Sequence, residues 1–156
     1  MQEIRTALGD LRGHRDFIKS PQVPSCDYYV TDPPFILEFD ESQHFSRPRL
    51  VALDNYPEKI PVGFPISRWR DLCREIDARD DEPFDRDERR AWYDTLRDLV
   101  PTIHGFKLTV RVYAEEFPWC SLDADSAAAL ENFQTLLRGR LSAKTRQFSI
   151  LASFAR

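Results

Sequence analysis

Two acidic residues stand two positions apart in an apolar run, and a third precedes them by the length of a short hairpin. The run spans residues 35–40 and contains Glu38 and Asp40, and the third acid is Asp27. Side chains two residues apart in a strand share a face, so Glu38 and Asp40 would project together, roughly 7 Å apart. With a turn centred after residue 32, Asp27 would lie across the hairpin from Glu38. We therefore expect three carboxylates to converge at one end of the hairpin.

Such a cluster of carboxylates needs a compensating charge. Like charges this close repel one another unless a proton or a cation lies between them. Ligands that are all oxygen select a hard divalent ion, Mg²⁺ or Mn²⁺, which keeps bound waters for chemistry. The sequence therefore suggests a metal site formed by Asp27, Glu38 and Asp40. The alternative is an exposed polar strand face, with Asp27 as an unrelated residue at the strand edge.

A small sheet and several helices would hold these acids in place. The hydrophobic periodicity predicts helices at 2–12, 46–55, 67–78, 85–99 and 123–138, and strands at 27–30, 35–40 and 106–113. Phe35, Leu37 and Phe39 would lie buried on the face opposite the acids. This order indicates a single α/β (α+β) domain over residues 1–156, with a small mixed sheet that contains an antiparallel hairpin.

The stretch 67–98 is dense in charges of both signs. It carries 8 Arg and 11 Asp or Glu, interleaved along the chain. Such mixing is typical of helix faces in contact with solvent, and we expect two solvated faces here. The expected role of Trp69, Trp92 and Trp119 is to anchor a core or a partner face rather than to stack on bases. The helices at 67–99 could also present a surface to a second copy or to another protein.

Composition excludes several classes of protein. The net charge of −4 argues against a coat protein that binds nucleic acid without specificity. The three cysteines form no C-x-x-C pair, which argues against structural zinc and disulfides and favours the cytoplasm. The sequence shows no signal peptide and no apolar run long enough to span a membrane. The five glycines build no phosphate-binding loop.

The segment 36–45, ILEFDESQHF, resembles the E-x-D-G-x-x-H segment of the PD-(D/E)XK nuclease superfamily. More narrowly, it is similar to the very-short-patch-repair-like branch and to related small bacterial proteins. The resemblance implies a restriction-endonuclease-like core in which helices flank the hairpin, with 67–99 as a helical insertion. Two positions depart from the pattern, because Asp40 stands where the superfamily has lysine and Glu41 where this segment has glycine.

The same resemblance implies metal-dependent hydrolysis of phosphodiester bonds in DNA, or in nucleic acid more generally. Asp27, Glu38 and Asp40 would hold Mg²⁺ or Mn²⁺. Gln43 would orient a water, and His44 would act as a general base or hold a phosphate oxygen. Contacts to the phosphates of the substrate are expected from six basic residues: Arg47, Arg49, Arg138, Arg140, Lys144 and Arg146.

Two other functions remain open from the sequence. The first is a nuclease-like module that has lost catalysis and binds nucleic acid or a protein partner, which the absent lysine favours. The second is an interaction protein that uses the charged helices at 67–99, as in a toxin–antitoxin or phage-defence assembly.

Overall fold

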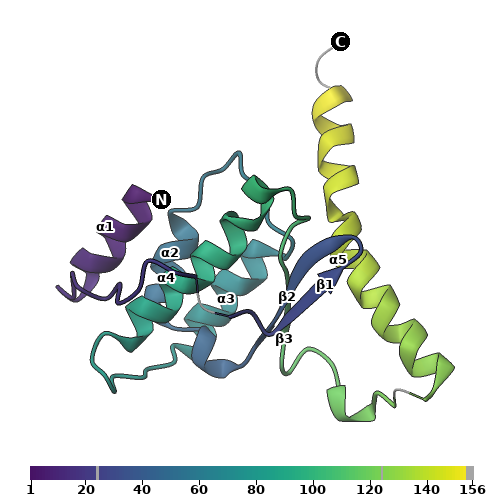
Figure 1. Cartoon of the computed structure of the whole chain (residues 1–156), viewed down its shortest axis with the longest axis horizontal. Helices are drawn as coiled ribbons and strands as arrows, with labels where there is room; N and C mark the ends of the chain where they lie inside the picture. Colours follow the sequence, from purple (N-terminus) through teal and green to yellow (C-terminus); the bar gives the residue numbers. More distant parts are fainter. Residues whose placement is uncertain (24, 124, 154–156) are drawn as a thin grey trace.

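A small mixed sheet stands between a layer of four helices and one long helix (Figure 1). The computed structural model describes residues 1–23, 25–123 and 125–153, with side chains as far as residue 140. The elements are, in order, α1 (Gln2–Leu11), β1 (Tyr28–Thr31), β2 (Pro34–Asp40), α2 (Arg47–Asp54), α3 (Ile66–Ile76), α4 (Arg86–Leu99), β3 (Val110–Tyr113) and α5 (Ala127–Ser153). Single turns of 3-10 helix lie at Ser42–His44, Pro101–His104 and Trp119–Ser121.

The sheet combines a hairpin with one parallel strand. β1 and β2 are antiparallel, with Tyr28 opposite Leu37. β3 runs parallel to β2 on its other side, because the chain returns through α2, α3 and α4 before β3 begins. The predicted mixed α/β organisation with a small sheet is therefore confirmed. The similarity of this fold to the restriction-endonuclease core stays a prediction.

Each face of the sheet is covered by a different layer. On one face, the strand residues Phe35, Leu37, Val110 and Val112 form an apolar cluster, against which Phe133, Leu136 and Leu137 of α5 pack. The expectation that Phe35 and Leu37 are buried opposite the acids is confirmed, and Phe39 is partly buried beside them. The other face of the sheet meets the helical layer.

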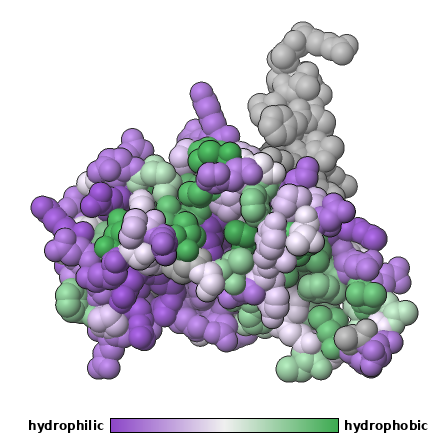
Figure 2. Space-filling model, viewed as in Figure 1, coloured by the Kyte–Doolittle hydropathy of each residue, from purple (hydrophilic) through white to green (hydrophobic). Residues whose placement is uncertain are grey.

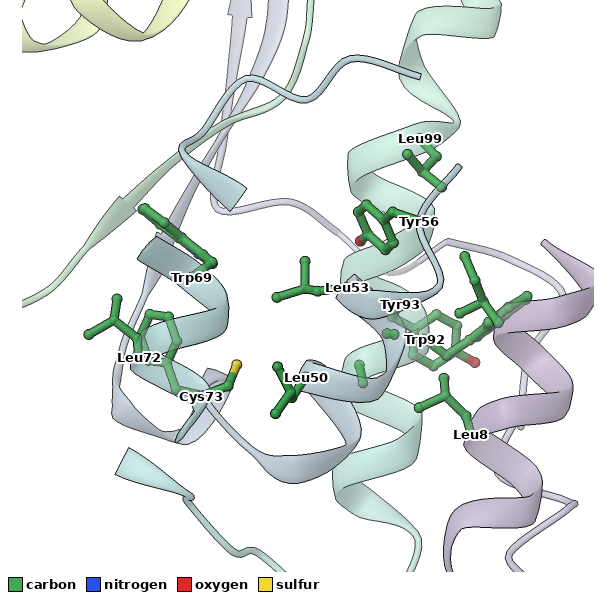
Figure 3. Packing of buried hydrophobic residues seen from close by; sticks show 14 of the residues in the cluster. Leu8, Leu50, Leu53, Tyr56, Trp69, Leu72, Cys73, Trp92, Tyr93 and Leu99 are labelled. Atoms are coloured by element: carbon green, nitrogen blue, oxygen red, sulfur yellow. The ribbon is translucent and has the colours of Figure 1, made fainter. Parts of the chain in front are cut away.

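The main hydrophobic core lies inside that helical layer (Figure 3). α2 is its centre: Ser46 caps the helix by accepting a hydrogen bond from the Arg49 N–H, and Leu50 and Leu53 point between α3 and α4. Trp69 of α3 and Trp92 of α4 are buried in this core, as the sequence predicted.

Two element boundaries differ clearly from the predicted ones. The strand expected at 106–113 begins only at Val110, because the chain before it is tied to the tip of the hairpin: the Lys107 N–H donates to the Pro34 carbonyl. Gly63 approaches β3 so closely that a Cβ there would lie 2.4 Å from the Thr109 carbonyl oxygen, so this position requires glycine. The last helix continues past residue 138 to Ser153.

The charges of α4 contradict the expectation of a solvated face. α3 does expose charged residues such as Arg68 and Glu75. In α4, by contrast, five charged side chains are buried: Asp87, Glu88, Asp94, Arg97 and Asp98. They are buried because α4 packs against α1, α2 and the sheet, and each has an oppositely charged partner outside α4: Arg12, Glu38 or Arg111.

The outer surface is polar. On the face drawn in Figure 2, hydrophilic residues predominate over the helical layer, with hydrophobic residues between them. Within the described residues, no helix has both the length and the apolar character needed to cross a bilayer.

The position of Leu53 leads to a first prediction. Its side chain is fully buried at the junction of α2, α3 and α4. Replacing it with alanine (Leu53→Ala) should lower the free energy of unfolding by about 2–5 kcal/mol, since a cavity would be left in a close-packed core. Urea unfolding followed by circular dichroism measures this. Ile103→Ala is the control, because Ile103 is exposed; an equal loss in both variants would contradict this account of the core.

Candidate functional site

Asp27 lies across the hairpin from Glu38, as expected. The Asp27 N–H donates to the Glu38 Oε1 at 3.3 Å, and the Asp27 Oδ2 accepts from the Phe39 N–H at 2.8 Å. The hairpin turn fixes this alignment, since Thr31 pairs with Pro34 and Tyr28 with Leu37. Asp27 itself stays exposed to solvent at the edge of the sheet.

Glu38 and Asp40 do not line an open face, and this corrects the expected convergence of three carboxylates. Their exposed fractions are 2% and 1%. Glu38 Oε2 lies 2.8 Å from the Arg97 Nε. One carboxylate oxygen of Asp40 pairs with Arg111, and the other accepts from the Trp69 Nε1 at 2.7 Å. Both oxygens of Asp40 are therefore engaged inside the protein.

These contacts belong to a buried network of ion pairs centred on Arg111. Arg111 has no exposed surface, and its Nε lies 2.6 Å from Asp98 Oδ1. It also contacts Asp40 and Asp94, and the charges of these three acids hold its pKa well above the ordinary value against the effect of burial. The buried network comprises four carboxylates (Glu38, Asp40, Asp94, Asp98), three guanidinium groups (Arg49, Arg97, Arg111) and His44.

Arg49 was expected to contact phosphates, and its position rules this out. Its side chain is buried, its Nη2 lies 2.7 Å from Asp98 Oδ2, and its Nη1 donates to the Tyr56 hydroxyl at 2.9 Å. Arg49 follows the helix N-cap Ser46 by three residues, so it points inward with the apolar side of α2. Its role is to neutralise Asp98.

His44 connects the buried network to the surface. It ends a single 3-10 turn after β2, where its Nδ1 lies 3.0 Å from the Asp94 Oδ2 and 3.5 Å from the Asp40 Oδ1. Burial by itself would lower the pKa of His44, but the charge of Asp94, the hydrogen bond to Asp94 and the charge of Asp40 outweigh it and raise that pKa. The imidazolium form is thereby favoured, which suits a proton donor or a phosphate ligand better than a general base.

A surface hollow of about 500 Å³ brings together part of the predicted site. It is lined by Asp27, Tyr28, Phe39, Glu41, Gln43 and His44. Asp27, Gln43 and His44 are three of the five expected catalytic residues. Glu38 lies directly behind Asp27, and burial raises its pKa. The fifth residue, Asp40, is turned into the buried network.

The fit of this hollow to a divalent cation is partial. In the described part of the chain, no three His, Cys, Asp or Glu side chains are grouped so that they could hold a metal ion. Mg²⁺ is commonly bound through only one or two carboxylates, with waters and substrate phosphate as its other ligands. Asp27 fits that smaller requirement with its exposed carboxylate, and Glu38 lies beside it with its Oε1 bonded to the Asp27 N–H and its Oε2 paired with Arg97. Asp40 does not, because Arg111 and Trp69 occupy its oxygens.

The basic residues expected to bind phosphates are dispersed. Arg47 is exposed and lines a second hollow, of about 710 Å³, together with Arg12, Arg74 and Arg79. The remaining four were expected on the last helix. Arg138 is exposed and bonds to Gln134, Arg140 pairs with Glu116 at 2.6 Å, and the side chains of Lys144 and Arg146 lie outside the described residues.

The sequence interpretation missed Asp94, Arg97 and Arg111. The strand expected at 106–113 contained one available signal, since its alternation places Arg111 on the polar face. In the structure, Arg111 lies opposite Glu38 in the parallel register, on the same face as that acid. Asp94 and Arg97 stand three residues apart, as a helical ion pair does, but nothing in their spacing reveals that they are buried.

The raised pKa of His44 predicts a dependence of stability on pH. A pKa raised in the folded state stabilises the fold fully below the unfolded value of 6.5, and this contribution is lost as the pH rises through the folded pKa. The unfolding midpoint in urea should therefore fall as the pH is raised from about 6.5. His44→Gln should lack this decrease. His104→Gln, at an exposed position, should keep it; a decrease that persists in His44→Gln would show that another group causes it.

Comparisons with known proteins identify no related protein. No family model matches the chain, and no curated protein and no solved structure matches it. The proposal for its function therefore rests on the residues themselves.

Proposed function

We propose that this chain hydrolyses phosphodiester bonds of nucleic acid, with DNA as the first expected substrate, at the hollow beside Asp27. One observation carries the proposal. The exposed carboxylate of Asp27, with Glu38 bonded to its backbone N–H, lines the same hollow as a histidine whose Nδ1 is held by a buried aspartate, Asp94. A carboxylate that can hold a metal ion and an oriented imidazole can together assist hydrolysis of a phosphate ester.

Each residue of the hollow has a definite task in this proposal. Asp27 and Glu38 would hold Mg²⁺ or Mn²⁺, which when bound lowers the pKa of a water and offsets negative charge on the phosphate. His44, with its Nδ1 engaged by Asp94, would donate from its Nε2 to a phosphate or leaving oxygen. Gln43 lines the same hollow and would orient the attacking water. Asp40 is assigned a structural task instead.

Binding of the polymer would involve the second hollow. Arg47 stands three residues after His44, and Arg74 and Arg79 share the hollow that Arg47 lines. This hollow is lined by four arginines and three aspartates (Asp77, Asp81 and Asp87), and guanidinium groups suit phosphate oxygens. The expected compartment is the cytoplasm, consistent with the free cysteines Cys26, Cys73 and Cys120.

A second function has its own support. Arg97 and Arg111 pair with Glu38 and Asp40, which are two of the three acids expected to hold the metal. An acid neutralised by arginine attracts a cation less strongly. The same fold could therefore serve as a module that binds nucleic acid or a protein partner without cleaving it, and the following experiment separates the two functions.

Cleavage should require a divalent ion and Asp27. The wild-type chain is incubated with single-stranded DNA, duplex DNA and RNA in Mg²⁺, Mn²⁺ or EDTA. We expect cleavage with either metal and none in EDTA. Asp27→Asn should abolish it, and His44→Gln should slow it by about 10²–10⁴-fold, the usual contribution of a positioned acid or base. Product lengths on a denaturing gel provide the measurement.

The control for this assay is Asp32→Asn. Asp32 is also an exposed acid of the hairpin, but it lies at the turn, at the opposite end from the hollow. Its loss should leave the rate unchanged. Absence of cleavage in every condition, together with binding that EDTA does not alter, would favour the non-catalytic module.

Binding to nucleic acid should depend on salt through the second hollow. Each of Arg47→Gln, Arg74→Gln and Arg79→Gln that removes a phosphate contact should reduce the slope of log K against log salt by about 0.7–0.9. Fluorescence anisotropy of a labelled oligonucleotide measures the slope. Arg68→Gln is the control, because Arg68 lies on α3 but does not line this hollow. Slopes that match the wild type in all three variants would place the polymer elsewhere.

A further inference from the structure

Tyr28 presents a large aromatic ring to solvent at the candidate site. Its exposed fraction is 60%, although Leu37, with which it pairs on β2, is buried. The ring is also part of the wall of the hollow that Asp27, Gln43 and His44 line. The hollow therefore has a polar side, with His44 beside the acids Asp27 and Glu41, and an aromatic side that hydrolysis of a phosphate ester does not require.

The strand geometry places these two sides on consecutive residues. Tyr28 pairs with Leu37, so it belongs to the sheet face that α5 covers, and Asp27 lies across from Glu38 on the other face. β1 is the outer strand of the sheet, so both side chains are reached from the same open edge. A nucleotide likewise presents a phosphate and a flat base on either side of one sugar.

The aromatic side is held in place by further rings. Phe39 lines the hollow beside Tyr28 and packs edge-to-face on Trp119, with ring centres 5.4 Å apart. Trp119 is fixed in turn, because its Nε1 donates to the Tyr113 carbonyl at 3.1 Å and Phe117 packs on it at 5.4 Å. Because Phe39 is already held in place, it loses little conformational freedom when a ligand stacks on the neighbouring Tyr28.

We infer that the hollow binds an unpaired nucleotide whose base stacks on Tyr28 while its phosphate faces His44, so that the substrate class is single-stranded nucleic acid. Every base has a face that can stack, so such a site tolerates all sequences. In a duplex the faces of the bases are already covered by their neighbours, and exposing one requires unstacking and unpairing it. The assignment of the phosphate rests on the proposed function, whereas stacking on Tyr28 needs no cleavage.

Binding of short oligonucleotides that contain 2-aminopurine tests this inference. The measurement is made in EDTA, so that metal-dependent cleavage does not interfere, and stacking is read from quenching of 2-aminopurine fluorescence. The wild type should bind the single strand and quench it, and should bind the matched duplex more weakly. Tyr28→Ala should weaken single-strand binding roughly 5- to 100-fold and remove the quenching, whereas Tyr28→Phe should retain both.

Tyr29→Ala is the matched control. Tyr29 is the next residue of β1 and has a similar exposed fraction, 54%, but it points to the opposite face and packs near Phe106. Its loss should change neither affinity nor quenching. Equal binding of single strand and duplex, or wild-type affinity in Tyr28→Ala, would overturn the inference. Tyr28-dependent binding in EDTA, with no cleavage in Mg²⁺ or Mn²⁺, would support stacking and refute the proposed hydrolysis, so the two failures are distinguishable.

Discussion

The ion pairs around Arg111 are the interaction on which the rest of the structure depends. Arg111 has no exposed surface and lies on the face of β3 that meets the helical layer. It contacts acids from both β2 and α4. Removal of one partner from such a buried set typically costs about 3–5 kcal/mol, because an uncompensated charge remains in the interior. Breaking one of these pairs would leave a charge uncompensated in the interior, so the network ties β2, β3 and α4 together.

That constraint divides the hairpin acids into two groups. Asp40 lies deep in the buried network, bonded to Trp69 and Arg111, where its charge serves the fold. Asp27 lies at the exposed edge, with its carboxylate steadied by a single backbone N–H. Glu38 stands between them, paired with Arg97 on one side and in contact with Asp27 on the other. The three hairpin acids look alike in sequence, but in the structure Asp40 stabilises the fold while Asp27 stays open to solvent.

The sequence predicted those parts of the fold that depend on local patterns. The alternation in 35–40 and the turn before it were enough to place Asp27 opposite Glu38, and Ser46 marked the start of α2. The environment of Asp40 could not be predicted in the same way, because its partners lie 29 and 71 residues further along the chain. The prediction that the charged residues of α4 face solvent was wrong for a related reason. Interleaved acids and arginines look the same in sequence whether their partners are water or each other.

The buried network also bears on how His44 could act in catalysis. Asp94 holds His44 by its Oδ2, while its Oδ1 accepts from Arg97 at 2.7 Å and from Arg111 at 3.3 Å. The charges of Arg111 and His44 hold the pKa of Asp94 well below its usual range, against the effect of burial. If His44 releases the proton from its Nε2, Asp94 still keeps two guanidinium partners and is not left unpaired. A histidine tied to a lone buried carboxylate would lack that support. The arrangement thus lets a single proton leave at the surface while the interior stays paired.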